Sequence, residues 1–240
     1  MIVPKWSAVI PAFNEARRLP RYLTEIVTYF EGRNEPFEVL VADDGSTDGT
    51  AAAVALIARA HPAVRVLRAE RNEGKGAAVR RGMLAAHGEY RLFADADGAT
   101  PIMELKRLEA ALASGAQVAI GSRARLDSSV AVVARRHRVL AGRVFNWIVG
   151  RIALVAIRDS QCGFKAFTAQ AAADLFGRLR TRGFAFDVEL LMLAQAAGYR
   201  VVEVAVNWTD QPGSKVGVMA SGPRMLWEIS LARFRMERRR

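Results

Sequence analysis

The sequence predicts an α/β protein whose central sheet is mainly parallel and is flanked by helices. Short apolar runs alternate along the chain with longer segments of helical spacing, a pattern typical of strand–helix–strand units with parallel strands. The apolar runs are hydrophobic on both faces, as in a sheet that is covered on both sides. Hydrophobic residues make up 51% of the 240 residues, which is enough for a sizeable core and excludes a globally disordered chain.

Each predicted element follows from its local pattern. Apolar runs predict strands over residues 7–13, 37–42, 64–69, 90–95 and 116–122. Helical spacing between these runs predicts helices over residues 16–31, 49–60, 75–86 and 101–113. Thr100 is expected to cap the last of these helices, with Pro101 in its first turn, because a hydroxyl and a proline favour those positions.

The later part of the chain and its cysteine content indicate where the protein is found. The apolar run 144–157 is too short to cross a bilayer and contains Arg151, so we expect a buried or interfacial helix. The first residues lack the long apolar region of a signal peptide. The single cysteine, Cys162, excludes an internal disulfide and fits a reducing compartment. These features predict a cytoplasmic location.

Polar clusters follow the first, second and fourth predicted strands at their carboxyl ends. The clusters read PAFNEARR (11–18), DDGSTDGT (43–50) and DADGAT (95–100). In open sheets of this kind, ligands bind beyond the carboxyl ends of the strands. We therefore expect the clusters to converge on one ligand-binding edge, although DDGSTDGT alone also fits a turn followed by a capped helix.

Asp95 and Asp97 are the candidate metal ligands. Residues i and i+2 of an extended segment project to the same side, so the two carboxylates can share a divalent cation. Mg²⁺ and Mn²⁺ prefer oxygen ligands, and Mg²⁺ usually combines one or two carboxylates with waters and substrate phosphates. The pair therefore indicates a site for a nucleoside diphosphate and its metal. The simpler alternative is two solvated loop aspartates.

The basic residues indicate an anionic partner. The formal net charge of +11 favours a phosphorylated substrate or an anionic membrane. Nucleic acid is not expected, because no binding module is visible and the acids at the ligand edge would repel a phosphate backbone. The segment 71–82 lacks the spacing of a phosphate-binding P-loop, but Lys75 within it is a candidate for a phosphate contact.

A set of motifs in a fixed order carries a family resemblance: VIPAFNE, VADDGSTDGT, NEGKGAAVRRGM, FADADGATP, IGSR, DSQCGFKAF, FAFDVELL and PGSKV. From about Ser7 to Val216, the chain resembles glycosyltransferase family 2, and within it the polyprenyl-phosphate branch of dolichyl-phosphate glucosyl- and mannosyltransferases. DSQCGFK and DVELL…PGSKV are closer to the glucosyl enzymes. The resemblance implies a GT-A fold in one catalytic domain (1–216), with a Rossmann-like nucleotide-sugar half (about 1–122) and an acceptor half (123–216).

The resemblance also implies roles for residues of the first half. The nucleobase and ribose site would be lined by Pro11, Phe13, Glu15, Ala42 and Asp44. Ribose, diphosphate and metal would be held by Asp95, Ala96 and Asp97. Mannosyl relatives often carry a polar metal-contacting side chain where this chain has Ala99, so either water completes the coordination or the metal is held less tightly.

On the acceptor side, the resemblance implies that Arg123 of IGSR and Lys215 of PGSKV meet phosphate groups at the active centre. An arginine of the segment ARRHR would assist them. Arg138 is the candidate, while Arg135 and Arg136 compete with it, and all these arginines also fit a solvated helix face.

The implied reaction transfers a hexose from a nucleotide sugar to a polyprenyl or dolichyl monophosphate, with inversion and a β-linked product. UDP-glucose is the expected donor and GDP-mannose the alternative. Mg²⁺ or Mn²⁺ would offset the charge that builds on the leaving diphosphate. A phosphate monoester has a second pKa of about 6 and is largely ionised at pH 7, so a general base such as Asp187 or Glu189 is optional. Basic side chains would orient the two anionic substrates.

Two other functions stay open at this point. Sugar nucleotidyl transfer also uses paired acids and a parallel sheet, but it would need a Gly-rich loop after the first strand, where this chain has PAFNEARR. Nucleotide-sugar binding without catalysis is the second. The presence of Asp95, Asp97, Arg123 and Lys215 argues against it.

Residues 217–240 are predicted to form a basic amphipathic tail. Trp227, Leu231 and Phe234 are spaced i, i+4 and i+7 and share one helical face, next to an arginine-rich end. Such a helix can lie in a lipid interface, which predicts peripheral contact with the cytoplasmic face of a membrane. The alternative is a helix docked on the domain, with its arginines in solvent.

Overall fold

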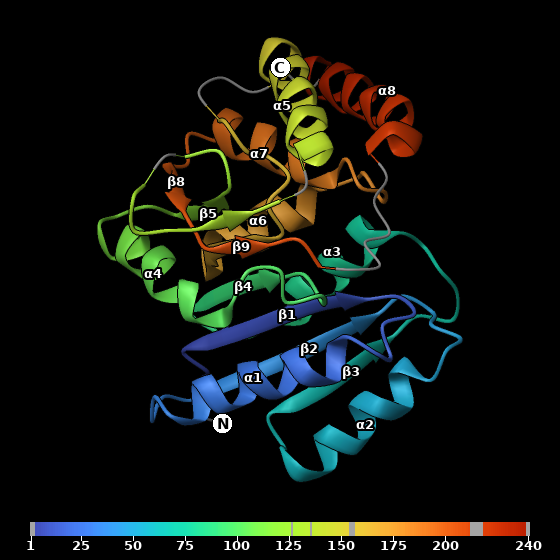
Figure 1. Cartoon of the computed structure of the whole chain (residues 1–240), viewed down its shortest axis with the longest axis vertical. Coiled ribbons are helices and arrows are strands. Elements are labelled where there is room, and N and C mark those ends of the chain that lie inside the picture. Colours follow the sequence, from blue (N-terminus) through green and yellow to red (C-terminus); the bar gives the residue numbers. More distant parts are fainter. Residues whose placement is uncertain (1–2, 126, 135, 154–156, 212–217, 239–240) are drawn as a thin grey trace.

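The computed structural model describes residues 3–125, 127–134, 136–153, 157–211 and 218–238, without the side chains of residues 136–141, 143 and 218–221. In these residues a seven-stranded sheet forms the centre of the molecule, with the order β3-β2-β1-β4-β7-β5-β8 (Figure 1). The strands are β1 (Trp6–Ala12), β2 (Phe37–Asp43), β3 (Val64–Arg68), β4 (Tyr90–Ala94), β5 (Val118–Ser122), β7 (Phe164–Thr168) and β8 (Val201–Ala205). Only β7 runs antiparallel to its neighbours. The predicted mainly parallel sheet is confirmed.

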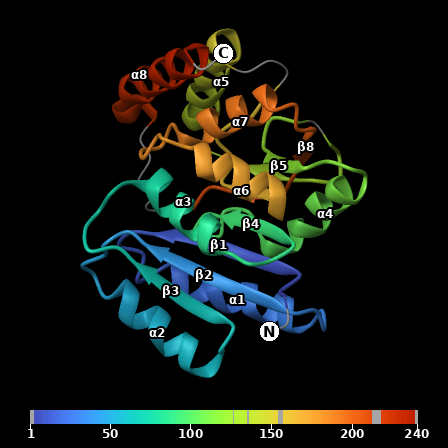
Figure 2. The ribbon, with the colours of Figure 1, turned by 180° about the vertical axis from the view of Figure 1, so that it is seen from behind.

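Helices cover both faces of the sheet, because alternate residues of the inner strands are apolar on both sides. In β1, Ala8 and Ile10 pack in one hydrophobic cluster and Val9 packs in the other. The first face is covered by α1 (Leu19–Glu31), α2 (Thr50–Ala60) and α4 (Leu105–Ala113). The second, seen in Figure 2, is covered by α3 (Lys75–Ala85), α6 (Ala169–Arg178) and α7 (Phe186–Ala196).

Helices α5 (Arg136–Ile152) and α8 (Val218–Glu237) pack against each other at one end of the molecule (Figure 1). The side of α8 that faces the domain carries Met225, Ile229 and Ala232, all of them buried. The C-terminal helix is therefore docked on the domain. Within the described ranges, no helix combines the length and the apolar character needed to cross a bilayer.

Shorter elements connect these layers. A small parallel sheet pairs β6 (Val132–Val133) with β9 (Trp208–Thr209), and the 3₁₀ helix η1 (Ile102–Glu104) precedes α4. Residues 144–152 of the predicted apolar run 144–157 supply the second half of α5, and residues 154–156 of that run lie outside the described residues. This half of α5 is partly buried, as expected: Phe145 and Val149 are buried, whereas Val144 and Trp147 are exposed.

The expectation that Thr100 caps a helix is wrong. The helical segment begins later, with η1 at Ile102. Among the described residues, no side chain caps the N-terminus of η1 by a hydrogen bond. Pro101 has ψ of 143°, which places it outside the helix. The Thr100 backbone takes part in a tertiary contact instead: the Tyr22 hydroxyl donates to the Thr100 carbonyl oxygen at 2.9 Å and ties this backbone to α1.

Candidate active site

The carboxyl ends of β1, β2 and β4 open into one cavity of about 820 Å³. Its wall on this side contains Pro11, Phe13, Glu15, Asp44, Asp95, Ala96 and Asp97. Ala42 lies within β2 instead, where it is fully buried. The predicted convergence of the polar clusters is confirmed, and the roles of these residues toward a nucleotide stay predictions.

Asp95 and Asp97 lie in a turn after β4, whereas the sequence predicted an extended segment. The backbone N of Gly98 donates to the Asp95 carbonyl oxygen at 3.4 Å. Gly98 has φ of +64°, a left-handed conformation that glycine adopts without steric cost. Both carboxylates nevertheless line the cavity, because the turn, rather than the pleat of a strand, brings them to the same side.

Strand β7 sets the position of Asp95. The antiparallel register places Ala94 opposite Phe164, and the pairing continues with the Asp95 backbone N donating to the Gly163 carbonyl oxygen at 2.9 Å. A Cβ atom at Gly163 would overlap the Asp95 carboxylate. The absence of a side chain at this position therefore makes room for the carboxylate at the cavity.

Two basic side chains flank the acidic pair. Lys75 Nζ lies 2.7 Å from Asp95 Oδ1, and Arg18 Nη1 lies 3.9 Å from Asp97 Oδ2. Burial, and then the negative charge of Asp95, raise the pKa of Asp97 above its ordinary value. A bound cation would offset this mutual repulsion of the two carboxylates. The predicted phosphate ligand Lys75 is here a partner of Asp95.

The donor set fits a divalent cation that is shared with a substrate. Among the residues with described positions, no third histidine, cysteine or acidic side chain joins Asp95 and Asp97 in a metal-binding cluster. Mg²⁺ commonly binds through one or two carboxylates together with waters and phosphate oxygens, and Mn²⁺ suits the same oxygen ligands. The pair therefore fits a metal whose remaining positions are filled by a diphosphate and water.

Other acids of this wall organise the backbone around the cavity. Asp44 accepts hydrogen bonds from the backbone N atoms of Glu73 (3.1 Å) and Gly74 (2.8 Å), and so fixes the start of α3. Glu15 pairs with Arg18 at 2.6 Å. Both acids line the cavity and hold the segments that surround the acidic pair.

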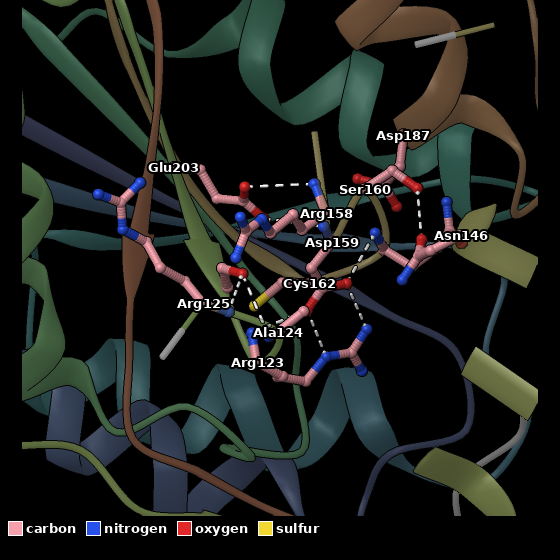
Figure 3. A network of polar contacts seen from close by, with 12 residues as sticks. Arg123, Ala124, Arg125, Asn146, Arg158, Asp159, Ser160, Cys162, Asp187 and Glu203 are labelled. Atoms are coloured by element: carbon pink, nitrogen blue, oxygen red, sulfur yellow. Dashed lines mark hydrogen bonds and ion pairs between the residues drawn. The ribbon is translucent and has the colours of Figure 1, made fainter. Parts of the chain in front are cut away.

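Arg123 follows β5 and is bound by Asp159, which is almost fully buried (Figure 3). Nε and Nη2 of Arg123 each donate to the Asp159 carboxylate at 2.7 Å. Although burial favours the neutral acid, the charge and hydrogen bonds of Arg123 lower the pKa of Asp159. Glu203 of β8 accepts from the Asp159 backbone N at 2.8 Å. In the described part of the chain Arg123 is not in the cavity wall, and its phosphate contact stays a prediction.

The side chains of the remaining basic residues predicted at the active centre lie outside the described part of the structure. Lys215 and Arg135 lie outside the described residues. Arg136 and Arg138 belong to α5, but their side chains lie outside the described part of the structure. Their contacts with phosphate stay predictions.

The acids considered as an optional base have structural contacts. Asp187 pairs with Lys165 at 2.5 Å, and both are buried. Glu189 accepts hydrogen bonds from the backbone N atoms of Arg180 and Thr181. Of the residues whose positions are described, neither acid belongs to the cavity wall. Each has a partner that accounts for its charge without a role at the reacting groups.

A second wall of the cavity was not predicted from the sequence. It is formed by the loop before α7 and by α8, and its basic residues are Arg180, Arg182, Arg224 and Arg235. The sequence did contain a pattern that could have indicated the α8 arginines, since Arg224, Leu231 and Arg235 are spaced i, i+7 and i+11 and so share one helical face. No sequence pattern indicated the loop arginines, because only folding brings that loop to the cavity.

Comparisons of the sequence identify relatives over most of the chain. Residues 7–175 match the family model described as Glycosyl transferase family 2. A dolichyl-phosphate beta-glucosyltransferase of Drosophila melanogaster is 43% identical over 223 residues, which cover 88% of this chain and 68% of that protein. The protein of the same name from Homo sapiens is 39% identical, with 88% and 69% covered.

Solved structures share the fold at lower sequence identity. Glucosyl-3-phosphoglycerate synthase from Mycobacterium tuberculosis, in complex with Mn²⁺ and UDP-glucose, has a TM-score of 0.71 at 21% identity, covering 96% of this chain and 79% of that one. Mannosyl-3-phosphoglycerate synthase from Rubrobacter xylanophilus has a TM-score of 0.72 at 19% identity, covering 99% and 76%. These neighbours have the GT-A fold, and the predicted GT-A fold of this chain is confirmed.

Proposed function

The chain belongs to glycosyltransferase family 2, and on this basis we propose that it transfers glucose from UDP-glucose to a dolichyl or related polyprenyl monophosphate. It is a glycosyltransferase with the GT-A fold. The observation that carries the proposal is a single cavity that joins the acidic pair to a wall rich in arginine. Two anionic reactants need such a site. The names of the curated relatives support glucose and a lipid phosphate as the substrates.

The donor diphosphate would lie at Asp95 and Asp97. When bound there, Mn²⁺ or Mg²⁺ supplies positive charge to the leaving diphosphate. Lys75 holds the Asp95 carboxylate at 2.7 Å and keeps it at the cavity. Arg18, 3.9 Å from Asp97, adds positive charge to the same side of the cavity, where it would favour a diphosphate.

The nucleoside part of the donor would lie against the part of the cavity wall that contains Pro11 and Phe13. Pro11 and Phe13 offer apolar surface to a base, and the carboxylates of Glu15 and Asp44 stand beside them. Ala42 would act through the backbone at the end of β2, since its side chain is fully buried. Ala96, between the two aspartates, would contact the ribose or the diphosphate.

The acceptor needs orientation more than activation. A phosphate monoester is largely ionised at pH 7, so its oxygen can attack the sugar carbon without losing a proton to the protein. Attack from the side opposite the leaving diphosphate would give inversion and a β-linked product. Asp187 and Glu189, which bind Lys165 and backbone N–H groups, are not required as bases in this scheme.

The surface of α5 and α8 supports a peripheral membrane contact as part of the proposal. Exposed apolar side chains on these helices include Val144, Trp147, Trp227 and Phe234. The guanidinium of Arg238 lies 4.4 Å from the centre of the Phe234 ring, and the whole chain is strongly basic. Aromatic and basic side chains together suit the interface of an anionic membrane. We place this contact at the cytoplasmic face, where a lipid acceptor can reach the cavity.

The assignment of separate parts of the chain to the donor and to the acceptor is part of the proposal. Residues 1–122 would form the nucleotide-sugar half and residues 123–216 the acceptor half, with 217–240 as the tail. One sheet runs through both halves, since β5 lies between β7 and β8. Because α8 supplies part of the cavity wall, the tail contributes to the acceptor side.

A test of donor and acceptor specificity decides the proposal. The protein is incubated with dolichyl phosphate, Mn²⁺ or Mg²⁺, and separately with UDP-glucose, GDP-mannose or UDP-N-acetylglucosamine. Lipid-linked glucose should form from UDP-glucose, and chelation with EDTA should stop it. Product from GDP-mannose alone would replace glucose by the mannosyl alternative. Absence of lipid-linked sugar with every donor would contradict the proposal.

A further inference from the structure

The second wall of the cavity combines guanidinium groups with apolar side chains. The loop before α7 contributes Arg180, Thr181, Arg182, Gly183 and Phe184, and α8 contributes Arg224, Met225, Glu228, Leu231 and Arg235. Residues that bind only a nucleotide or a metal do not need this mixture. A ligand with an anionic head and an apolar body does, since each part then meets a complementary surface.

Glu189 fixes the loop through its backbone. Glu189 is 4% exposed, and its carboxylate accepts from the backbone N of Thr181 at 2.6 Å and from that of Arg180 at 3.2 Å. Because main-chain N–H groups satisfy this buried acid, Glu189 does not need the arginine side chains of the loop as partners, and these side chains are available to a ligand in the cavity. Neither Arg180 nor Arg182 has an acidic partner among the described residues.

The loop is also attached beside the acidic pair. The backbone N of Ala77, in the first turn of α3, donates to the Arg182 carbonyl oxygen at 3.2 Å. Lys75 of the same turn pairs with Asp95 at 2.7 Å. A Cβ atom at Gly74 would overlap the Arg182 carbonyl group, so the close approach depends on glycine. An anion bound by the loop arginines therefore lies near the proposed position of the donor diphosphate.

Helix α8 extends this wall into a groove. Arg224 and Arg235 are eleven residues apart on one helical side, a separation of about 16 Å at 1.5 Å per residue. Leu231 lies between them on the same side. Glu228 pairs with Arg224 at 3.2 Å and offsets its charge. The net positive charge of the wall therefore comes from the loop and from Arg235, and its length suits an extended ligand rather than a compact ion.

We propose that this wall is the acceptor subsite, which binds a phosphate monoester carrying a long apolar chain. Arg180 and Arg182 bind the phosphate, since guanidinium groups match phosphate oxygens in bidentate geometry. Phe184, Met225 and Leu231 contact the chain along α8. The inference rests on the proposed function and deepens it by naming the acceptor site. It also makes α8 a part of the active site.

Kinetics of matched variants of the full-length protein test the subsite. The double variant Arg180→Ala/Arg182→Ala should raise the KM for dolichyl phosphate by about tenfold or more and leave the KM for UDP-glucose unchanged. Leu231→Asp, which puts a negative charge into the groove, should do the same. The control Ser230→Asp adds the same charge one residue away on an exposed position, and Arg21→Ala removes an exposed arginine of α1. Both controls should behave as wild type.

Competition separates a lipid headgroup from free phosphate as the ligand. Citronellyl phosphate, a soluble isoprenyl monophosphate, should compete with dolichyl phosphate at lower concentration than inorganic phosphate does. Equal competition by inorganic phosphate would assign the arginines to a free anion and overturn the lipid subsite. If a variant has no measurable activity, calorimetric titration with citronellyl phosphate replaces the KM, and undiminished affinity counts against the inference.

The outcomes distinguish the subsite from the reaction. Wild-type transfer to dolichyl phosphate with an unchanged acceptor KM in the double arginine variant would overturn the subsite and leave the proposed function intact. An equal rise in the KM for UDP-glucose would also overturn it, because the arginines would then serve the donor. Absence of transfer to dolichyl phosphate by the wild-type protein would contradict both.

Discussion

Lys75 is a cation built into the fold next to Asp95. Its ammonium group lies 5.4 Å from the centre of the Phe93 ring and 5.9 Å from that of Phe186. Burial by itself would lower the pKa of Lys75, but the charges of Asp95 and Asp187 raise it above its ordinary value. Lys75 therefore stays charged and holds the Asp95 carboxylate in place. Asp97 depends more on the cation that the substrate complex would bring.

At the same scale, Asp97→Asn separates catalysis from stability. Transfer should fall by about 100-fold or more, the usual effect of losing one charged group at a developing anion. The free energy of unfolding at pH 7 should not fall, because burial and Asp95 already disfavour the ionised Asp97 in the folded state. The measurements are kcat and urea denaturation. A large loss of stability would show that Asp97 has a structural role instead.

Asp159→Asn, in contrast to Asp97→Asn, should lower the free energy of unfolding. Removing the charge leaves the Arg123 guanidinium without its buried partner, at a cost of about 3 kcal/mol in the free energy of unfolding. The pKa of Asp159 is lower in the folded protein than in the unfolded chain, where it is about 4. The ion pair therefore stabilises the folded state fully above about pH 4, and this stabilisation is lost as the pH falls through the lower pKa of the folded protein. The gap between wild type and variant should therefore shrink below pH 4. Urea denaturation from pH 7 to pH 3 measures it, and a constant gap would contradict the assignment.

At the scale of elements, β7 and the turn after β4 form one unit. The antiparallel pairing carries Gly163 to the Asp95 carboxylate, so the single reversed strand of the main sheet has a direct effect on the site. The position of the acidic pair Asp95 and Asp97 is thus a property of two elements rather than of the DADG sequence alone.

Gly163→Ala tests this unit. A Cβ atom there would overlap the Asp95 carboxylate and displace it from Lys75, so metal affinity and kcat should both fall by about tenfold or more. The matched control is Gly150→Ala in α5, where a Cβ meets nothing within 4 Å and alanine should stabilise the helix by about 0.5–1 kcal/mol. Equal kcat for the two variants would contradict the role given to Gly163.

The elements that the sequence predicted well are those whose bounds follow from the pattern of their own residues. Strands such as β1 and β2 alternate apolar residues for both faces, and their bounds differ little from the predicted 7–13 and 37–42. The cap predicted at Thr100 was wrong because Pro101, with ψ of 143°, precedes the helical segment, and a residue distant in sequence, Tyr22, binds the Thr100 backbone. The turn at Asp95–Gly98 was missed because an alternating DAD pattern also fits an extended chain.

The acidic side of the site was predictable, and the basic side was not. Carboxylates at the carboxyl ends of parallel strands are placed by topology alone, and they do meet in the cavity. The α8 arginines reach it only because Met225, Ile229 and Ala232 dock that helix on the domain. The sequence left open whether this helix was docked or interfacial, so its contribution to the wall was not foreseen.

At the scale of the whole molecule, charge and exposed aromatic residues predict membrane binding. Vesicles containing phosphatidylserine should retain the protein, and binding should weaken with salt. Trp227→Ser/Phe234→Ser should lower the partition coefficient by about tenfold or more, since each ring contributes about 1.5–3 kcal/mol when buried.

The control for membrane binding is Leu56→Ser. Leu56 is as exposed as Trp227, at 68% against 70%, but it lies on α2 at the opposite end of the molecule (Figure 1). Its substitution should leave vesicle binding unchanged. Equal binding by the control and the aromatic variant would contradict a membrane contact through α8.

The central claim is that Asp95 and Asp97 hold the donor together with a divalent cation. Calorimetric titration of UDP-glucose, with and without Mn²⁺, tests it most directly on the wild-type protein and on Asp97→Asn. Mn²⁺ should tighten UDP-glucose binding to the wild type by about tenfold or more and should have little effect on the variant. The same gain in both proteins, or no gain in the wild type, would contradict the claim.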